Sequence, residues 1–139
     1  GTKESGTFFI YNNWDFNVAG YIFEKETGKN IYDAFESDIA DKIGFQQWDR
    51  SKQKKSGDTT KSQFKAYHFE LSTRDMARVG YLMLRKGKWK NEQVIPSSWV
   101  ERSTSITTSY AEMYKVDPRL KNWPWWKWGQ RFCFNYSGV

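Results

Sequence analysis

The chain has 139 residues and a net charge of +6, with 38% hydrophobic and 19% aromatic residues. This length fits one domain with its own core, and this composition is too apolar for a disordered chain. No apolar run approaches the roughly 20 residues that a membrane span needs. Cys133 is the only cysteine, which excludes an internal disulfide and a cysteine-based metal site. We expect no cofactor.

The first 45 residues predict a strand and two helices. Residues 7–11 are β-branched and aromatic, as in a short buried strand. The apolar spacing then predicts a helix from Asp15 to Thr27, which Gly28 ends. A second helix follows a cap at Asn30 and ends at Gly44. The expected buried faces are Phe16, Ala19, Ile22 and Phe23 in the first helix and Ile31, Phe35, Ile39 and Ile43 in the second.

Residues 46–65 are polar and basic and lack a period, so we expect a long loop. Much of the positive charge lies here, between Arg50 and Lys65. A basic surface can attract phosphates or anionic lipid. The simpler interpretation is a solvated loop, because the run has no phosphate-cradling glycines.

The clearest helix is predicted from Thr73 to Lys86, with Ser72 and Asp75 forming its cap and Gly87 ending it. A turn at residues 88–91 comes next, and Pro96 then favours a short helix through Trp99 and Val100. The expected buried face of the long helix is Met76, Val79, Gly80 and Met83.

The last part, residues 105–139, holds a tryptophan-rich cluster at 123–128 and an alternating segment at 131–136 that predicts a strand. The whole chain is therefore mainly α with short strands, an α+β class. The abrupt start at Gly1 and the end after Ser137-Gly138 suggest a fragment, divided into segments 7–45, 46–65, 66–104 and 105–139.

Few residues could serve as a nucleophile with its base. A Ser-His-Asp triad would need His68, the only histidine, although a lone histidine there is more often structural. Ser51 and Lys54 match Ser-x-x-Lys, in which a lysine one helical turn away takes the serine proton. The match falls in the lysine-rich loop, where chance matches are easy. No cluster has metal-ligand spacing.

Several blocks in order resemble the serine β-lactamase-related hydrolases, which include class C β-lactamases, penicillin-binding carboxypeptidases and esterases. Residues 6–17 resemble the segment that carries the Tyr-x-Asn motif, here Tyr11-Asn12-Asn13. Residues 19–29 resemble the helix after it, and residues 39–45 resemble the turn beyond that helix. Residues 71–80 are similar to the family's Ser-x-Arg-Asp-x-Ala-Arg helix, and residues 87–89 and 94–100 are similar to the family's segments after that helix.

The resemblance implies the helical portion of the β-lactamase/transpeptidase-like fold with an incomplete sheet. Tyr11 would shuttle a proton to and from the nucleophilic serine, and Asn13 would bind substrate and the catalytic lysine. The family's Ser-x-x-Lys lies upstream of Tyr-x-Asn, and its third motif should lie beyond Tyr136-Ser137-Gly138. The nucleophile is therefore absent, with Ser51 an improbable substitute, and we expect the chain alone to be inactive.

The parent would hydrolyse an ester, amide or β-lactam through an acyl-enzyme. We expect it to be periplasmic or exported, from the family only. Uncovered apolar surfaces predict a homo-oligomer or strand exchange. We expect no specific nucleic acid and no membrane span. The alternative is a non-catalytic module that uses the tryptophans at 123–128 and the Arg50–Lys65 loop to bind carbohydrate or nucleic acid.

Overall fold

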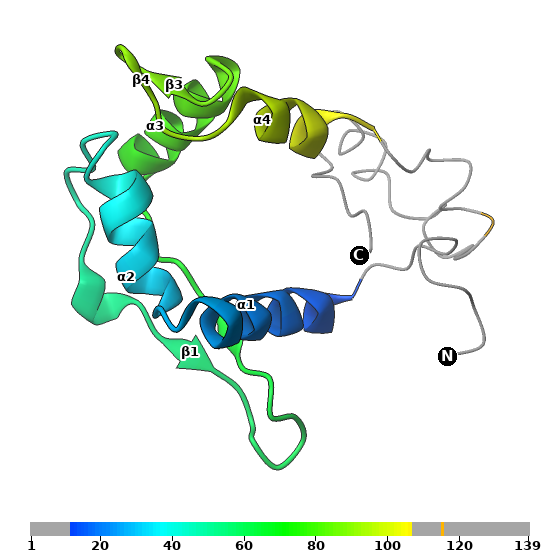
Figure 1. Cartoon of the computed structure of the whole chain (residues 1–139). Helices are drawn as coiled ribbons and strands as arrows, with labels where there is room; N and C mark the ends of the chain where they lie inside the picture. Colours follow the sequence, from blue (N-terminus) through cyan, green and yellow to red (C-terminus); the bar gives the residue numbers. More distant parts are fainter. Residues whose placement is uncertain (1–11, 107–114, 116–139) are drawn as a thin grey trace. The chain divides into compact units, whose positions relative to one another are not determined.

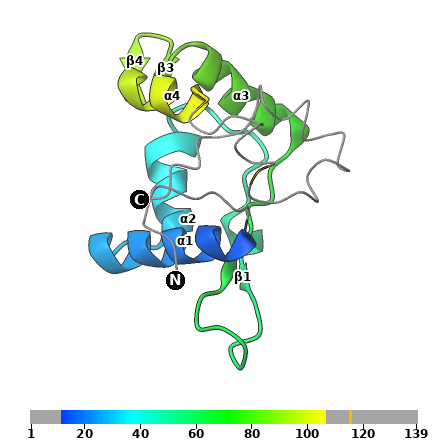
Figure 2. The same ribbon diagram turned by 90° about the vertical axis from the view of Figure 1, so that its right-hand side faces the viewer.

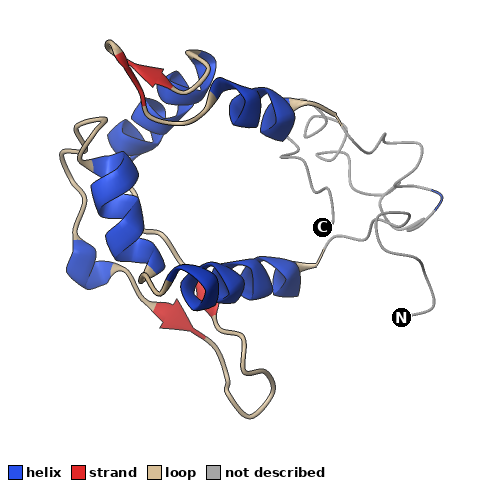
Figure 3. Ribbon diagram, viewed as in Figure 1, coloured by secondary structure: helices blue, strands red, loops and turns tan. Residues whose placement is uncertain are grey.

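The computed structural model describes residues 12–106 and residue 115. It has two compact units, one made of residues 12–96 and the other containing residues 97–106, and each is described by itself. The described residues form four α-helices and two small antiparallel sheets of two strands each. Figure 3 colours the helices blue and the strands red. The α+β class predicted from the sequence is confirmed at this coarse level.

Helix α1 (Asn13–Thr27) begins two residues before its predicted start. Asn12 caps it, because its side-chain oxygen accepts the backbone N–H of Trp14 at 3.0 Å. Gly28 ends it with a φ of +68°, a left-handed conformation that costs glycine least. The predicted strand at residues 7–11 lies outside the described residues.

Helix α2 (Ile31–Phe35) runs directly into a π-helical turn, η1 (Glu36–Ala40), and lies crosswise to α1 (Figure 2). Asn30 caps it as predicted. The predicted stripe is wrong in part, because only Ile43 of its four residues is fully buried. A π turn holds more residues than an α turn, so a four-residue repeat does not stay on one face. Tyr32, Ala34 and Ala40 are buried instead.

The predicted loop at residues 46–65 contains regular structure, which corrects the sequence interpretation (Figure 1). It includes a 3₁₀ turn, η2 (Arg50–Lys52), and strand β1 (Lys55–Ser56). Strand β1 pairs with β2 (Ala66–Tyr67), with Lys55 opposite Tyr67 and Ser56 opposite Ala66. Two-residue strands are too short to show an alternating pattern, so the sequence predicted only a loop.

Helix α3 (Thr73–Leu84) has the predicted cap, but its buried face was predicted wrongly. Asp75 and Leu82 are buried, whereas Met76 and Gly80 are exposed. The sequence placed Asp75 in the cap alone, and an aspartate is rarely buried unless it has partners. A tight hairpin follows, with β3 (Lys88–Trp89) paired to β4 (Glu92–Gln93). The other unit contains α4 (Ser97–Thr104), which begins directly after Pro96 as predicted.

Aromatic rings fill the centre of the larger unit. Phe35 packs against Phe45, Trp48 and Phe69, with ring centroids 5.8, 5.2 and 5.1 Å away. Tyr32 adds a contact with Phe69 at 5.1 Å. Aromatic pairs at these distances contribute beyond the area that they bury. This cluster ties α2 to the segment between β2 and α3.

Candidate functional site

The Tyr-x-Asn motif leads into the first helix. Tyr11 lies outside the described residues. Asn13 is the first residue of α1, and its side chain is exposed. The Asn12 cap fixes where this helix starts, and the backbone of Asn13 is therefore held in place by the hydrogen bond of the cap.

Ser51 does not have the geometry of a Ser-x-x-Lys nucleophile. It lies in the 3₁₀ turn η2, which ends at Lys52 before the chain becomes extended at Gln53. Lys54 is therefore not one helical turn from it, as that chemistry requires. The Ser51 hydroxyl instead donates to the carboxylate of Asp49 at 2.6 Å. The pKa of Asp49 is lowered, first by this hydrogen bond and then by the backbone N–H of Ser51.

His68 has a serine partner that the sequence did not indicate. Its Nε2 lies 2.6 Å from the hydroxyl of Ser56 across the β1–β2 pair. Both side chains are exposed. A serine hydroxyl bonded to an imidazole nitrogen is the first requirement of histidine-assisted nucleophilic chemistry. The pairing depends on the register of a hairpin that the sequence did not predict, so no sequence signal could have identified it.

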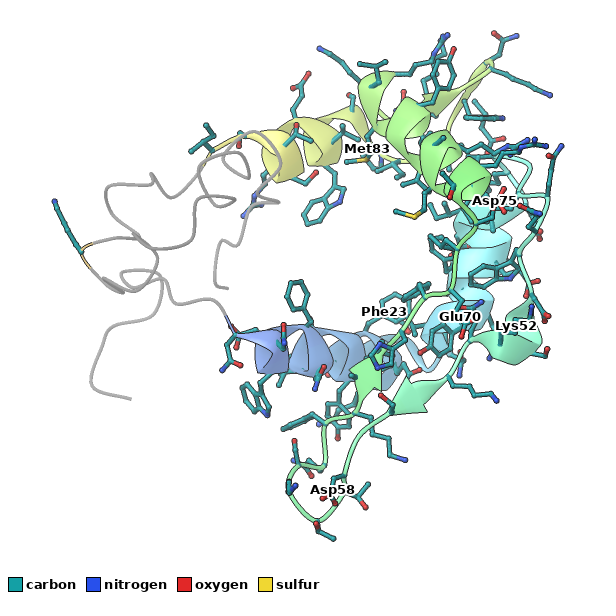
Figure 4. The ribbon with its side chains drawn as sticks, turned by 180° about the vertical axis from the view of Figure 1, so that it is seen from behind. Phe23, Lys52, Asp58, Glu70, Asp75 and Met83 are labelled. Atoms are coloured by element: carbon teal, nitrogen blue, oxygen red, sulfur yellow. The ribbon has the colours of Figure 1, made fainter. Side chains whose placement is uncertain are left out.

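Asp75 joins two distant blocks of the chain. Its carboxylate accepts the backbone N–H groups of Gln46 and Gln47, each at 3.0 Å, and the hydroxyl of Ser72 at 2.9 Å. Arg78 completes the set at 3.2 Å. We call these residues the Asp75 joint (Figure 4). Burial alone would raise the pKa of Asp75, but these hydrogen bonds and the Arg78 charge outweigh it and hold the pKa below its usual value.

Glu24 makes a second joint, near the end of α1. It pairs with Lys55 and accepts the Tyr67 hydroxyl at 3.1 Å and the backbone N–H of Ile31 at 3.2 Å. We call these residues the Glu24 joint. Burial would raise the pKa of Glu24, but these bonds lower it overall. Burial and the hydrogen bond to Glu24 raise the pKa of Tyr67 to about 12, so this phenol stays protonated at neutral pH.

Much of the basic stretch between Arg50 and Lys65 is neutralised locally. Arg50 pairs with Asp33, which lies on another element. Three lysines of the stretch also have carboxylate partners, and these pairs are Lys52–Asp49, Lys55–Glu24 and Lys61–Asp58. Figure 4 shows Asp58 at the tip of the loop between β1 and β2. A phosphate would have to compete with these carboxylates, which favours the solvated-loop interpretation.

An apolar groove of about 590 Å³ lies between α1, α2 with η1, and the β2 segment. Its lining includes Phe16 and Phe23 of α1, Phe35 and Ile39, and Phe69. Phe16 is 49% exposed. The predicted buried face of the first helix is wrong, because only Gly20 of α1 is buried. This open surface is lined by residues that the sequence assigned to buried faces, namely Phe16, Ala19 and Phe23 of the first helix and Ile31, Phe35 and Ile39 of the second. An open surface this apolar is typical of one that meets another segment or molecule.

Two kinds of site were not found in the described part of the chain. Residues 12–106 contain no group of three or more histidine, cysteine, aspartate or glutamate side chains that could hold a metal ion. No described helix is both long enough and apolar enough to cross a membrane.

No family model, curated protein or solved structure matches the chain.

Proposed function

We propose that this chain is part of a serine hydrolase of the β-lactamase-related family. In this proposal Tyr11 moves the proton of the nucleophilic serine, and Asn13 holds the substrate beside it. The serine and its lysine come from sequence outside these 139 residues. The reaction is attack of the serine on an ester, amide or β-lactam carbonyl, followed by release of the acyl group to water.

The observation that carries the proposal is the Asp75 joint. The blocks at residues 39–45 and 71–80 each resemble the family, and residues 46–70 lie between them. Asp75 belongs to the second block, and its carboxylate binds the two residues that directly follow the first. This contact supports the proposal because it makes the two resembling blocks parts of one folded unit, as the resemblance implies.

The apolar groove supports the same proposal. Helix α1 contacts the β1–β2 hairpin through Tyr21, Asn17 and Gly20, while Phe16 and Phe23 face the groove. A helix with apolar residues on two sides is normally covered on both. The proposal assigns the groove to the family's sheet, which these residues do not supply. A homo-oligomer that covers the groove would be the other outcome.

The binding-module alternative has less support. Its basic surface is largely paired with carboxylates, and its tryptophan-rich segment at 123–128 lies outside the described residues. A salt-dependent shift on adding an oligonucleotide would favour the module. The hydrolase proposal expects no specific shift.

The test uses the gene product with the sequence that flanks these residues, incubated with a penicillin and followed by intact-mass spectrometry. We expect one penicilloyl group on a serine outside this chain. Tyr11→Phe should slow acylation by about 10²–10⁴-fold, the usual contribution of a proton-transfer group. Tyr21→Phe, a matched control on α1, should acylate normally. A product that is never acylated, or a Tyr11→Phe variant with the wild-type rate, would refute the proposal.

A further inference from the structure

Ser56 and His68 lie on one face of the β1–β2 hairpin. Ser56 is opposite Ala66, and His68 follows Ala66 by two residues, so the side chains at these three positions share a side of the pair. A diagonal neighbour in such a pair is within reach of a long side chain. The imidazole of His68 spans this diagonal, and its Nε2 lies 2.6 Å from the Ser56 hydroxyl.

The opposite face of the hairpin is fixed to α1, and this holds the register. The Tyr67 ring lies against Gly20 so closely that a Cβ there would overlap it. The Glu24 joint binds Tyr67 and Lys55, which are partners across the two strands. Asn17 also donates to the carbonyl of Phe64 at 3.2 Å. A pair supported by such packing is better ordered than one on a free loop.

The pair is open to a reactant and lies in a basic part of the chain. Both side chains are exposed. Lys54 and Lys65 flank the two strands in the sequence, and neither makes an ion pair with another described residue. Gly57 follows Ser56 with a φ of +146°, a backbone conformation that favours glycine. Positive charge nearby favours the negatively charged intermediate of acyl transfer.

We propose that Ser56 is an acylatable nucleophile with His68 as its general base, acting on small activated esters and phosphonyl fluorides. With the ring proton on Nδ1, Nε2 takes the Ser56 proton as Oγ bonds to the carbonyl carbon. The bond to the leaving alcohol or phenol then breaks, and that group leaves with the proton held by His68. With a phosphonyl fluoride, Oγ bonds to phosphorus instead, the P–F bond breaks, and fluoride leaves with that proton. Water cleaves the acyl-serine by the same route and restores the Ser56 hydroxyl.

This site is independent of the family's chemistry. It uses a histidine instead of a lysine one helical turn away, and all of its residues lie within the described part of the chain. A penicillin reports on the proposed hydrolase site, whereas a fluorophosphonate and this chain alone report on Ser56. The two proposals can therefore fail separately.

The experiment treats the 139-residue chain with a fluorophosphonate at neutral pH and maps the adduct by tandem mass spectrometry. We expect one adduct, on Ser56. Ser56→Ala should abolish it, and His68→Gln should slow it by about 100-fold or more, the low end for a general base. Ser62→Ala, a matched control in the same loop, should label normally.

Circular dichroism and a thermal melt of each variant will show that the fold is retained. An adduct on another serine, no adduct on a folded chain, or unchanged labelling of a folded His68→Gln variant would overturn the proposal.

Discussion

The Asp75 and Glu24 joints both bind segments that are distant in the sequence, but water reaches them differently. The Asp75 side chain is 1% exposed, and the Glu24 side chain is 18% exposed. Two backbone N–H groups, a serine hydroxyl and Arg78 bind Asp75, while one backbone N–H group, a long lysine and a tyrosine hydroxyl bind Glu24. Short, fixed donors lose little freedom when they bind, whereas a lysine side chain must be ordered first. Asp75 should therefore matter more to stability.

The largest expected effect is the loss of the Asp75 carboxylate. Asp75→Ala leaves the Gln46 and Gln47 N–H groups and the partly buried Arg78 without their acceptor. We expect the free energy of unfolding to fall by about 3–5 kcal/mol, the usual cost of removing one partner from a buried charged pair. Urea denaturation measures this change. The exposed Asp41→Asn variant should stay within about 0.5 kcal/mol, and an equal loss in both variants would contradict a special role for the joint.

A second variant tests the packing beside the Glu24 joint. Gly20→Ala places a methyl group against the Tyr67 ring and should cost about 1–3 kcal/mol by overpacking. Gly80→Ala is the matched control, because nothing lies within 4 Å of its added Cβ on the exposed side of α3. It should stabilise the chain by about 0.5–1 kcal/mol through helix propensity. Thermal melts of both variants should therefore move in opposite directions.

Acid should weaken both joints. The folded chain holds the pKa values of Asp75 and Glu24 below their usual values, so the unfolded chain takes up protons first as the pH falls. Their contribution is complete above the unfolded pKa of about 4 and is lost as the pH falls through the folded values. Unfolding measured from neutral pH down to about pH 2 should show this loss. In Asp75→Asn the slope should be shallower, and an unchanged slope would exclude Asp75 as a source.

The smallest expected effect concerns the tyrosine of the Glu24 joint. Tyr67→Phe keeps the ring against Gly20 but removes the hydrogen bond to Glu24, so we expect a loss of about 1 kcal/mol. Tyr21→Phe removes a hydroxyl from an exposed ring and should change stability by less than about 0.5 kcal/mol. If Tyr67→Phe lowered the free energy of unfolding as much as Asp75→Ala, the claim that the Asp75 joint matters more to stability would be contradicted.

The sequence predicted features that depend on neighbouring residues. Ser72 with Asp75, Asn30 and Gly28 all act within one turn of a helix end, where local spacing determines the hydrogen bonds. Features that depend on distant segments were not predicted. No sequence pattern indicates the hydrogen bonds from Gln46 and Gln47 to Asp75. These bonds accompany the burial of an aspartate, a residue type that usually lies at the surface.

The candidate sites divide in the same way. Tyr11 and Asn13 were predicted as site residues from segments that resemble the hydrolase family, and such a resemblance depends only on the order of residues along the chain. Ser56 and His68 came together only through the β1–β2 register, which two-residue strands are too short to indicate. The π turn η1 likewise shifted the buried face of the second helix, because the sequence carried no signal for a wider turn.

The measurement closest to the central claim is intact-mass spectrometry of this chain after incubation with a penicillin and, separately, a fluorophosphonate. We predict no penicilloyl adduct, because the proposed hydrolase takes its nucleophile from outside these residues, and a single phosphonyl group on Ser56. A stoichiometric penicilloyl adduct on Ser51, or on any other serine of the chain, would contradict the account and make this chain a complete enzyme.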